Sequence, residues 1–84
     1  MDLGSAIIPE HAVQQMGKRS ISERDLREVL ECPEAVLPVR EGRIVAQAMR
    51  GSYLLRVFVD IDREPPEVVT AYRTSKIEKY RSQA

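Results

Sequence analysis

The spacing of apolar residues changes near residue 35, and this change constrains the fold more than any other feature of the sequence. Before it, apolar residues recur every three or four positions, as in amphipathic helices. After it, apolar and polar residues largely alternate within short segments, as in β-strands. These segments are residues 35–40, 43–50, 53–60 and 67–73. Because the first two connections are only two residues long and contain glycine, the sequence predicts an antiparallel meander of three or four strands.

Two helices are predicted ahead of these strands. The first covers residues 9–19 and begins at a proline, which suits the first helical position. The second has a clear start, because Ser22 can cap it and Asp25 follows three residues later in a variant of the capping box. Ile21 and Leu26 occupy the two positions of a hydrophobic staple. Each helix is therefore predicted to bury one apolar side.

The remaining signals complete the predicted fold. Ser75 and Glu78 have the spacing of a capping box, so a short helix is predicted after the last strand. Pro38 cannot donate a hydrogen bond to a neighbouring strand, which places the first strand at an edge. Residues 1–8 fit either a short strand or a frayed end. The order predicts a single α+β domain over residues 1–84, with two N-terminal helices packed on one face of a three- to four-stranded antiparallel sheet and a short C-terminal helix.

Side-chain alternation predicts which residues face the helices. The side chains assigned to the helix side are purely apolar: Leu55, Val57, Val59, Val69 and Ala71. The side chains assigned to the opposite face, here called the second face, are mixed in character: Gln47, Leu54, Arg56, Phe58, Val68, Thr70 and Tyr72. Such a face resembles neither a core nor a solvated surface. We therefore expect the second face to be uncovered and to meet a ligand or partner, with Arg56 at its centre.

Composition narrows the function classes. Thirteen basic and thirteen acidic residues leave no net charge, which argues against attachment to nucleic acid by bulk charge but allows a local basic patch. No apolar run is long enough to cross a bilayer and no signal pattern precedes the first helix, so a cytoplasmic location without membrane contact is expected. His11 and Cys32 are the only residues of their types, so no internal disulfide, metal site or cofactor is predicted.

The N-terminal half resembles a small prokaryotic family known only as a domain of unknown function. The matching residues are His11, Ala12, Met16, Arg19, Ile21, Ser22 and Pro33. The segment Val68–Tyr80 also resembles the end of that family, so the resemblance spans residues 8–80. Gln15 stands where the family pattern has arginine, and Ser20 stands where it has glycine.

This family is similar in fold to the RelE/ParE-like toxins of bacterial toxin–antitoxin pairs, several of which cleave messenger RNA. The resemblance implies a toxin-like protein of a type II pair, neutralised by an antitoxin protein. It also implies a messenger-RNA endoribonuclease that works without a metal ion. Loss of the arginine at position 15 weakens the expected phosphate contact of the first helix.

Cleavage of this kind needs a base for the 2′-hydroxyl, cations for the phosphate and an acid for the leaving oxygen. Histidine is the residue type that can act as either acid or base near neutrality, so His11 is a candidate for either proton-transfer role. Guanidinium groups fork onto two phosphate oxygens, which suits Arg56 and Arg73. A tyrosine can donate a proton or stack on a base. The catalytic candidates are therefore His11, Arg56, Tyr72 and Arg73, and the candidates for RNA contact are Arg19, Lys76 and Tyr80.

Several of these residues have structural alternatives. A histidine near a helix start is commonly a surface or capping residue. Tyr80 follows Ile77 by three positions and can pack the last helix onto the sheet. Arg73 can pair with Glu78 or Glu67 instead of a phosphate. The alternative function is a non-catalytic interaction module that uses the second face to bind a protein partner or to form a homo-oligomer.

Overall fold

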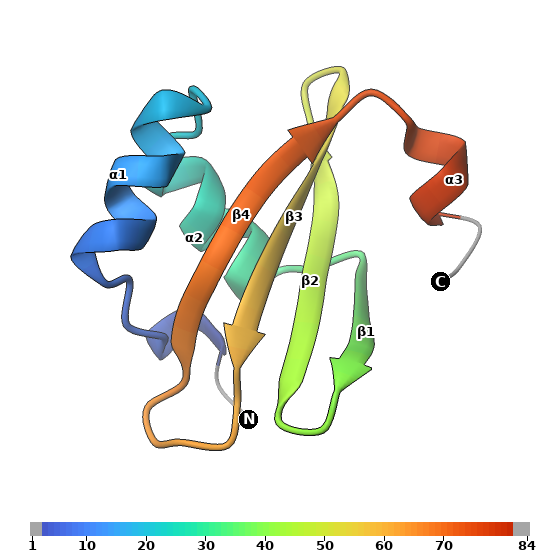
Figure 1. Cartoon of the computed structure of the whole chain (residues 1–84). Helices are drawn as coiled ribbons and strands as arrows, with labels where there is room; N and C mark the ends of the chain where they lie inside the picture. The colour runs from blue at the N-terminus through green and yellow to red at the C-terminus, as the bar shows by residue number, and fades with distance from the viewer. Residues whose placement is uncertain (1–2, 82–84) are drawn as a thin grey trace.

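The helices and strands follow the predicted order. The computed structural model describes residues 3–81, with side chains up to Tyr80. The elements are a 3₁₀ turn η1 (Leu3–Ser5), α1 (Glu10–Lys18), α2 (Glu23–Glu31), β1 (Ala35–Arg40), β2 (Arg43–Arg50), β3 (Tyr53–Asp60), β4 (Glu67–Thr74) and α3 (Ile77–Arg81). The four strands form one antiparallel sheet in chain order, with β1 and β4 at its edges (Figure 1). The predicted α+β fold is confirmed.

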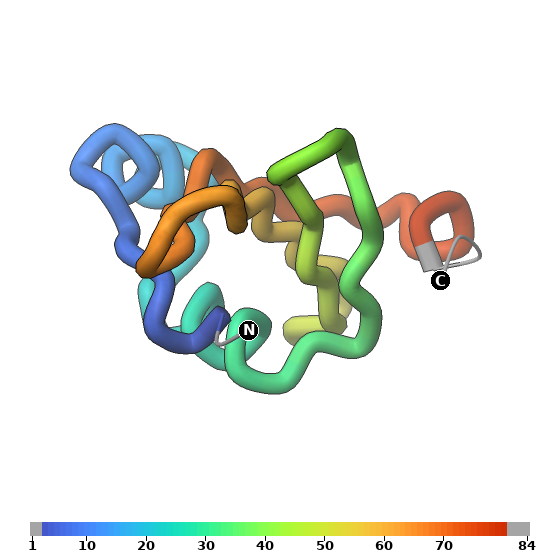
Figure 2. Tube along the Cα trace, turned by 90° about the horizontal axis from the view of Figure 1, so that it is seen from below, coloured from blue at the N-terminus to red at the C-terminus, as the bar shows by residue number. Residues whose placement is uncertain are grey.

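The core lies between the N-terminal helices and one face of the sheet, here called the first face. Helix α1 packs beside β4, and α2 packs across β2 and β3. Helix α3 lies on the far side of the molecule from α1 (Figure 2). The buried apolar side chains of this core include Ala12, Met16, Leu26, Val29, Leu30, Ala46, Ala48, Leu55, Val57, Val59, Val68 and Ala71.

Local chemistry explains where α2 and the hairpins begin. The Ser22 hydroxyl accepts a hydrogen bond from the Asp25 backbone N–H at 3.1 Å, which caps α2 as predicted. Ile21 and Leu26 are both buried, as a hydrophobic staple requires. Gly42 and Gly51 have φ angles of 81° and 63°, which only glycine adopts without strain in these tight turns.

One residue of β4 departs from simple alternation. Phe58 pairs with Thr70, whereas Val59 pairs with Val68, so Val69 is an extra residue in β4. Such a bulge reverses the side-chain alternation beyond it. Val68 is therefore buried in the core, and the prediction that Val69 occupies this position was wrong.

Of the N-terminal segment, residues 3–8 neither form a regular strand nor lie free, and residues 1–2 lie outside the described part of the chain. The Ile7 N–H donates to the Pro66 carbonyl at 2.8 Å, and the Val68 N–H donates to the Ile7 carbonyl at 2.8 Å. Arg27 of α2 donates through Nη1 to the carbonyls of Gly4 and Ala6 at 3.1 and 2.7 Å. These bonds satisfy backbone groups of the segment and attach it to α2 and to the start of β4.

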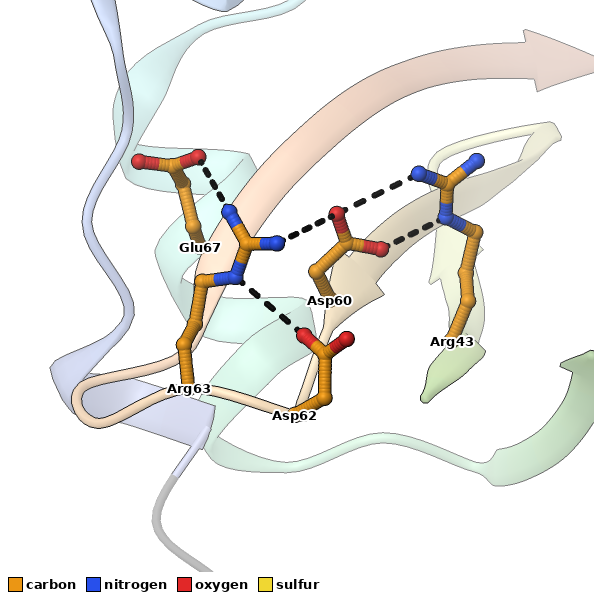
Figure 3. Close-up of polar contacts among 5 residues, drawn as sticks. All are labelled: Arg43, Asp60, Asp62, Arg63 and Glu67. Atoms are coloured by element: carbon orange, nitrogen blue, oxygen red, sulfur yellow. Dashed lines mark hydrogen bonds and ion pairs between the residues drawn. The ribbon is translucent and has the colours of Figure 1, made fainter. Parts of the chain in front are cut away.

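A charged network closes the end of the sheet where β3 meets β4. Arg43 holds Asp60 with two hydrogen bonds, from Nε to Oδ1 at 2.6 Å and from Nη2 to Oδ2 at 3.2 Å. Arg63 forms ion pairs with Asp60, Asp62 and Glu67 (Figure 3). The hydrogen bond from Arg43 holds the pKa of Asp60 below its ordinary value, against the opposing effect of burial.

The lowered pKa of Asp60 predicts a pH-dependent contribution to stability. The folded state favours the carboxylate, so this contribution is complete above the unfolded-state pKa of ~3.9 and is lost as the pH falls through the folded-state value. Asp60→Asn should therefore lower the free energy of unfolding at pH 7, and its difference from wild type should shrink below about pH 4.

Urea unfolding of both proteins at pH 7 and pH 3 measures this difference. Asp62→Asn is the matched control, because Asp62 is 59% exposed and meets Arg63 only at the surface. It should change stability less than Asp60→Asn does. An Asp60→Asn effect that is the same at both pH values would contradict the assigned role of the carboxylate.

Candidate functional site

The middle of the second face is covered, which corrects the expectation that the whole face is open. Gln47 and Leu54 are 1% and 0% exposed, and Arg56 is 8% exposed. Part of this cover is α3, which follows β4 after a two-residue link and turns back at the end of the sheet (Figure 1). It places Tyr80 against Arg56 and Gln47. Packing its aromatic side chain there removes apolar area from water, which favours the closed arrangement.

Arg56 lies at the centre of an aromatic cluster. Its guanidinium carbon is 4.1 Å from the ring centroid of Tyr80, 5.6 Å from that of Phe58 and 5.8 Å from that of Tyr72. Its Nε donates to Gln47 Oε1 at 3.0 Å, and its Nη1 donates to the Tyr72 hydroxyl at 2.6 Å. Partners within the chain therefore hold this cation, through hydrogen bonds and cation–π contacts.

Gln47 and Tyr72 complete the cluster. Gln47 Nε2 donates to the Tyr80 carbonyl at 3.3 Å, which joins α3 to β2. The rings of Phe58 and Tyr72 stack with centroids 6.0 Å apart. Burial raises the pKa of Tyr72, against the opposing effect of the Arg56 hydrogen bond. The Tyr72 hydroxyl is therefore protonated at neutral pH, and the raised pKa makes it a weaker proton donor than an ordinary tyrosine.

The four catalytic candidates do not meet at one place. Arg56 and Tyr72 are in contact on the second face. His11 is exposed on α1, whose buried residues belong to the core on the first face. Arg73 pairs with Leu55 and has the orientation of the first-face residue Ala71. The structure therefore separates His11 and Arg73 from Arg56.

Arg19 and Gln15 attach α1 to the edge of β4. Arg19 Nη1 donates to Thr70 Oγ1 at 3.2 Å and to the Ala71 carbonyl at 2.8 Å. Thr70 Oγ1 in turn donates to Gln15 Oε1 at 2.6 Å. An arginine at position 15 has no acceptor atom, so it cannot accept this bond. Glutamine at this position thus suits helix attachment.

A small pocket lies near the start of α2, where β2 ends, β3 begins and β4 ends. Its volume is about 40 Å³, and it is lined by Ser20, Ile21, Asp25, Arg50, Tyr53, Leu55 and Arg73. Of these residues, only Arg73 was a predicted site residue. The sequence held one signal for the others, because the two-residue turn at 51–52 pairs Arg50 with Tyr53.

The two arginines that line the pocket are incompletely paired among the described residues. The Arg73 guanidinium carbon is 4.7 Å from the ring centroid of Tyr53. Arg73 forms no ion pair within residues 3–81, and Glu67 pairs with Arg63 instead. Arg50 donates to the Met49 carbonyl at 3.0 Å and pairs with Glu28 at 3.2 Å, but its buried Nε has no acceptor among the described residues.

Residues 8–73 match the family described as Domain of unknown function (DUF4258). The chain belongs to the DUF4258 family. The match includes α1, α2 and the strands up to Arg73, and α3 with Tyr80 follows it. The resemblance to an uncharacterised family is confirmed. No curated protein and no solved structure matched the chain.

The remaining RNA-contact candidates of this DUF4258 protein occupy different surroundings. Lys76 is exposed, and its backbone N–H donates to Thr74 Oγ1 at 3.0 Å. Tyr80 packs over Arg56, which agrees with its structural alternative. Within residues 3–81, no group of three or more His, Cys, Asp or Glu side chains is arranged to hold a metal ion. Over the same residues, no helix has the length and apolar character needed to cross a membrane.

This DUF4258 chain has serine at position 20, where the expected family pattern has glycine, and the backbone conformation there favours glycine. The φ angle of Ser20 is 57°, in the left-handed region that a side chain disfavours by about 1–2 kcal/mol. Ser20→Gly should remove this strain. Part of the gain is offset because glycine is more flexible in the unfolded chain, so we expect a net stabilisation of about 0.5 kcal/mol in urea unfolding.

Ser52→Gly is the control for this substitution. Ser52 also lies in a turn, but it is not among the residues with positive φ. The same change should therefore lower stability slightly through backbone flexibility alone. Equal effects at the two positions would contradict strain at Ser20.

Proposed function

We propose that this DUF4258 protein is a RelE/ParE-like toxin of a type II toxin–antitoxin pair, and that it cleaves messenger RNA without a metal ion. The observation that carries the proposal is a gathering of cations at one end of an α-α-β-β-β-β-α fold. Its proposed partners are RNA and an antitoxin protein.

Basic residues gather near the pocket although the net charge of the chain is zero. Arg50 and Arg73 line the pocket, and Arg19, which directly precedes the pocket residue Ser20, donates to the Ala71 carbonyl of β4. Asp25 and Glu28 oppose part of this charge, whereas the arginines at the opposite end of the sheet are paired with Asp60, Asp62 and Glu67. A local excess of arginine lets a neutral protein present a positive field to a phosphate backbone.

The geometry also changes which residues suit the proposed cleavage. Arg56 is engaged by Gln47, Tyr72 and Tyr80, so an incoming phosphate would have to displace partners from its own chain. Arg73 forms no ion pair among the described residues, and it lines the pocket. Arg73 is therefore the predicted phosphate contact that the geometry favours.

Expression in a bacterium tests the proposal. The protein alone should slow growth, co-expression with the neighbouring gene should restore it, and the purified protein should cleave messenger RNA in the presence of EDTA. Arg73→Gln should reduce both effects, whereas Arg63→Gln, at the opposite end, serves as the matched control. Soluble protein that neither slows growth nor cleaves RNA would contradict the proposal.

A non-catalytic interaction module is the second candidate. It is favoured by two exposed apolar residues of the edge strand β1, Val36 and Val39, which are 47% and 46% exposed. This edge could bind a protein partner or a second copy of the chain. Light scattering should then give a mass above the monomer that Val36→Lys reduces, and a monomer at all concentrations would contradict self-association.

A further inference from the structure

We infer that the pocket between the start of α2, the β2–β3 turn and the end of β4 is a phosphate-binding site. The inference names the RNA contact of the function proposed above, and it rests on that function only for the source of the phosphate. The pocket is defined by the lining residues given above. A phosphate group there would meet two guanidiniums and a hydroxyl.

Arg73 supplies the first cation. Its guanidinium carbon is 4.7 Å from the ring centroid of Tyr53, within the range of a cation–π contact. Such a contact does not provide a counter-ion, and the N–H donors of a guanidinium can fork onto phosphate oxygens. No carboxylate within residues 3–81 forms an ion pair with it.

Arg50 supplies the second cation and an unsatisfied donor. Its Nη groups meet the Met49 carbonyl and Glu28, whereas its Nε is buried and has no acceptor within the described part of the chain. A buried N–H without a partner is costly, so the hydrogen bonding of Arg50 is incomplete in this arrangement. An anion that draws the Arg50 side chain toward the pocket would give this N–H a partner, and this is the feature that points to a ligand.

The size of the pocket selects a single phosphate group. One water needs roughly 10–15 Å³ of such space, so about 40 Å³ holds a group with three or four oxygens rather than a whole nucleotide. The rest of a nucleotide would lie outside the pocket, beside Tyr53, which is 40% exposed.

Neighbouring carboxylates should weaken the binding of phosphate in the pocket. Asp25 lines the pocket and Glu28 pairs with Arg50, so the two guanidiniums are opposed by two negative charges. Binding of free phosphate should therefore be weak, and removing the charge of Asp25 should strengthen it. Other cations are less suited to this role, because Arg43 and Arg63 are held by carboxylates and Arg56 is enclosed by rings.

NMR titration of the full ¹⁵N-labelled chain tests the site. The probes are inorganic phosphate, uridine 3′-monophosphate and a short RNA oligonucleotide whose 2′-hydroxyls are methylated to prevent cleavage. The amides of Ser20, Ile21 and Tyr53 should shift first. Arg73→Gln and Arg50→Gln should each weaken binding about tenfold, Asp25→Asn should strengthen it several-fold, and Arg63→Gln should leave it unchanged.

Different results would contradict the phosphate site and the proposed toxin function. Equal weakening by Arg63→Gln and Arg73→Gln, or shifts spread over the whole surface, would overturn the site. If Arg50→Gln does not fold, Arg73→Gln alone decides. Pocket binding without growth arrest or RNA cleavage would support the site and contradict the toxin function, whereas arrest with no pocket binding would do the reverse.

The three probes distinguish the sources of the phosphate. The oligonucleotide should bind more tightly than the mononucleotide, because Arg19 directly precedes the pocket residue Ser20 and can meet a further phosphate. Tighter binding of the mononucleotide would overturn the assignment to RNA and support a free nucleotide as the ligand.

Discussion

Replacing Leu26 by alanine should lower the free energy of unfolding by about 3 kcal/mol. Leu26 is 0% exposed and belongs to the core between α2 and the first face of the sheet. The change removes buried apolar area and leaves a cavity that the surrounding side chains fill only in part. A domain of 84 residues has a total stability of roughly 4–12 kcal/mol, so this loss is a large share of it.

Urea unfolding followed by circular dichroism measures the change. Val13→Ala is the control, because Val13 lies on α1 and is 46% exposed. It should change stability by less than about 0.5 kcal/mol. Similar small effects at both positions would show that α2 contributes little to the core.

The fold was predictable because its signals are local. The Ser22 cap, the staple of Ile21 and Leu26, and the glycines of two tight turns each act within a few residues. The change of apolar period then fixes which segments form helices and which form strands. None of these features requires knowledge of distant contacts.

The bulge in β4 was not predictable from alternation. Val68 and Val69 are both apolar and adjacent, so the sequence is equally consistent with either residue in the core. The choice depends on how β4 pairs with β3, where one residue of β4 has no partner. A register set by pairing between strands is a tertiary property.

The covering of the second face and the pocket were missed for a related reason. The sequence indicates a helix after β4, but the direction in which that helix packs depends on a contact between Tyr80 and Arg56. The pocket likewise joins Ser20, Arg50 and Arg73, which come from three separate segments. Sequence periodicity places residues on a face but does not bring distant segments together.

Arg56→Ala should lower the free energy of unfolding by about 3 kcal/mol because Arg56 holds α3 on the sheet. The change deletes cation–π contacts worth about 1–2 kcal/mol in a desolvated site. It also leaves Gln47 Oε1 without its donor, on a side chain that is 1% exposed, and such a loss costs about 1–3 kcal/mol. Relief of the cost of burying a charge offsets part of this sum.

Near-ultraviolet circular dichroism together with urea unfolding measures this loss, because Tyr72 and Tyr80 should lose their fixed packing along with it. Arg24→Ala is the matched control, since the Arg24 side chain is 88% exposed, and it should change stability by less than about 0.5 kcal/mol. Arg56→Met should cost less than Arg56→Ala, because methionine fills the space beneath Tyr80 without a buried charge. A stability of Arg56→Ala within 0.5 kcal/mol of wild type would mean that the cluster is not structural, and Arg56 would again become a candidate for contact with a ligand.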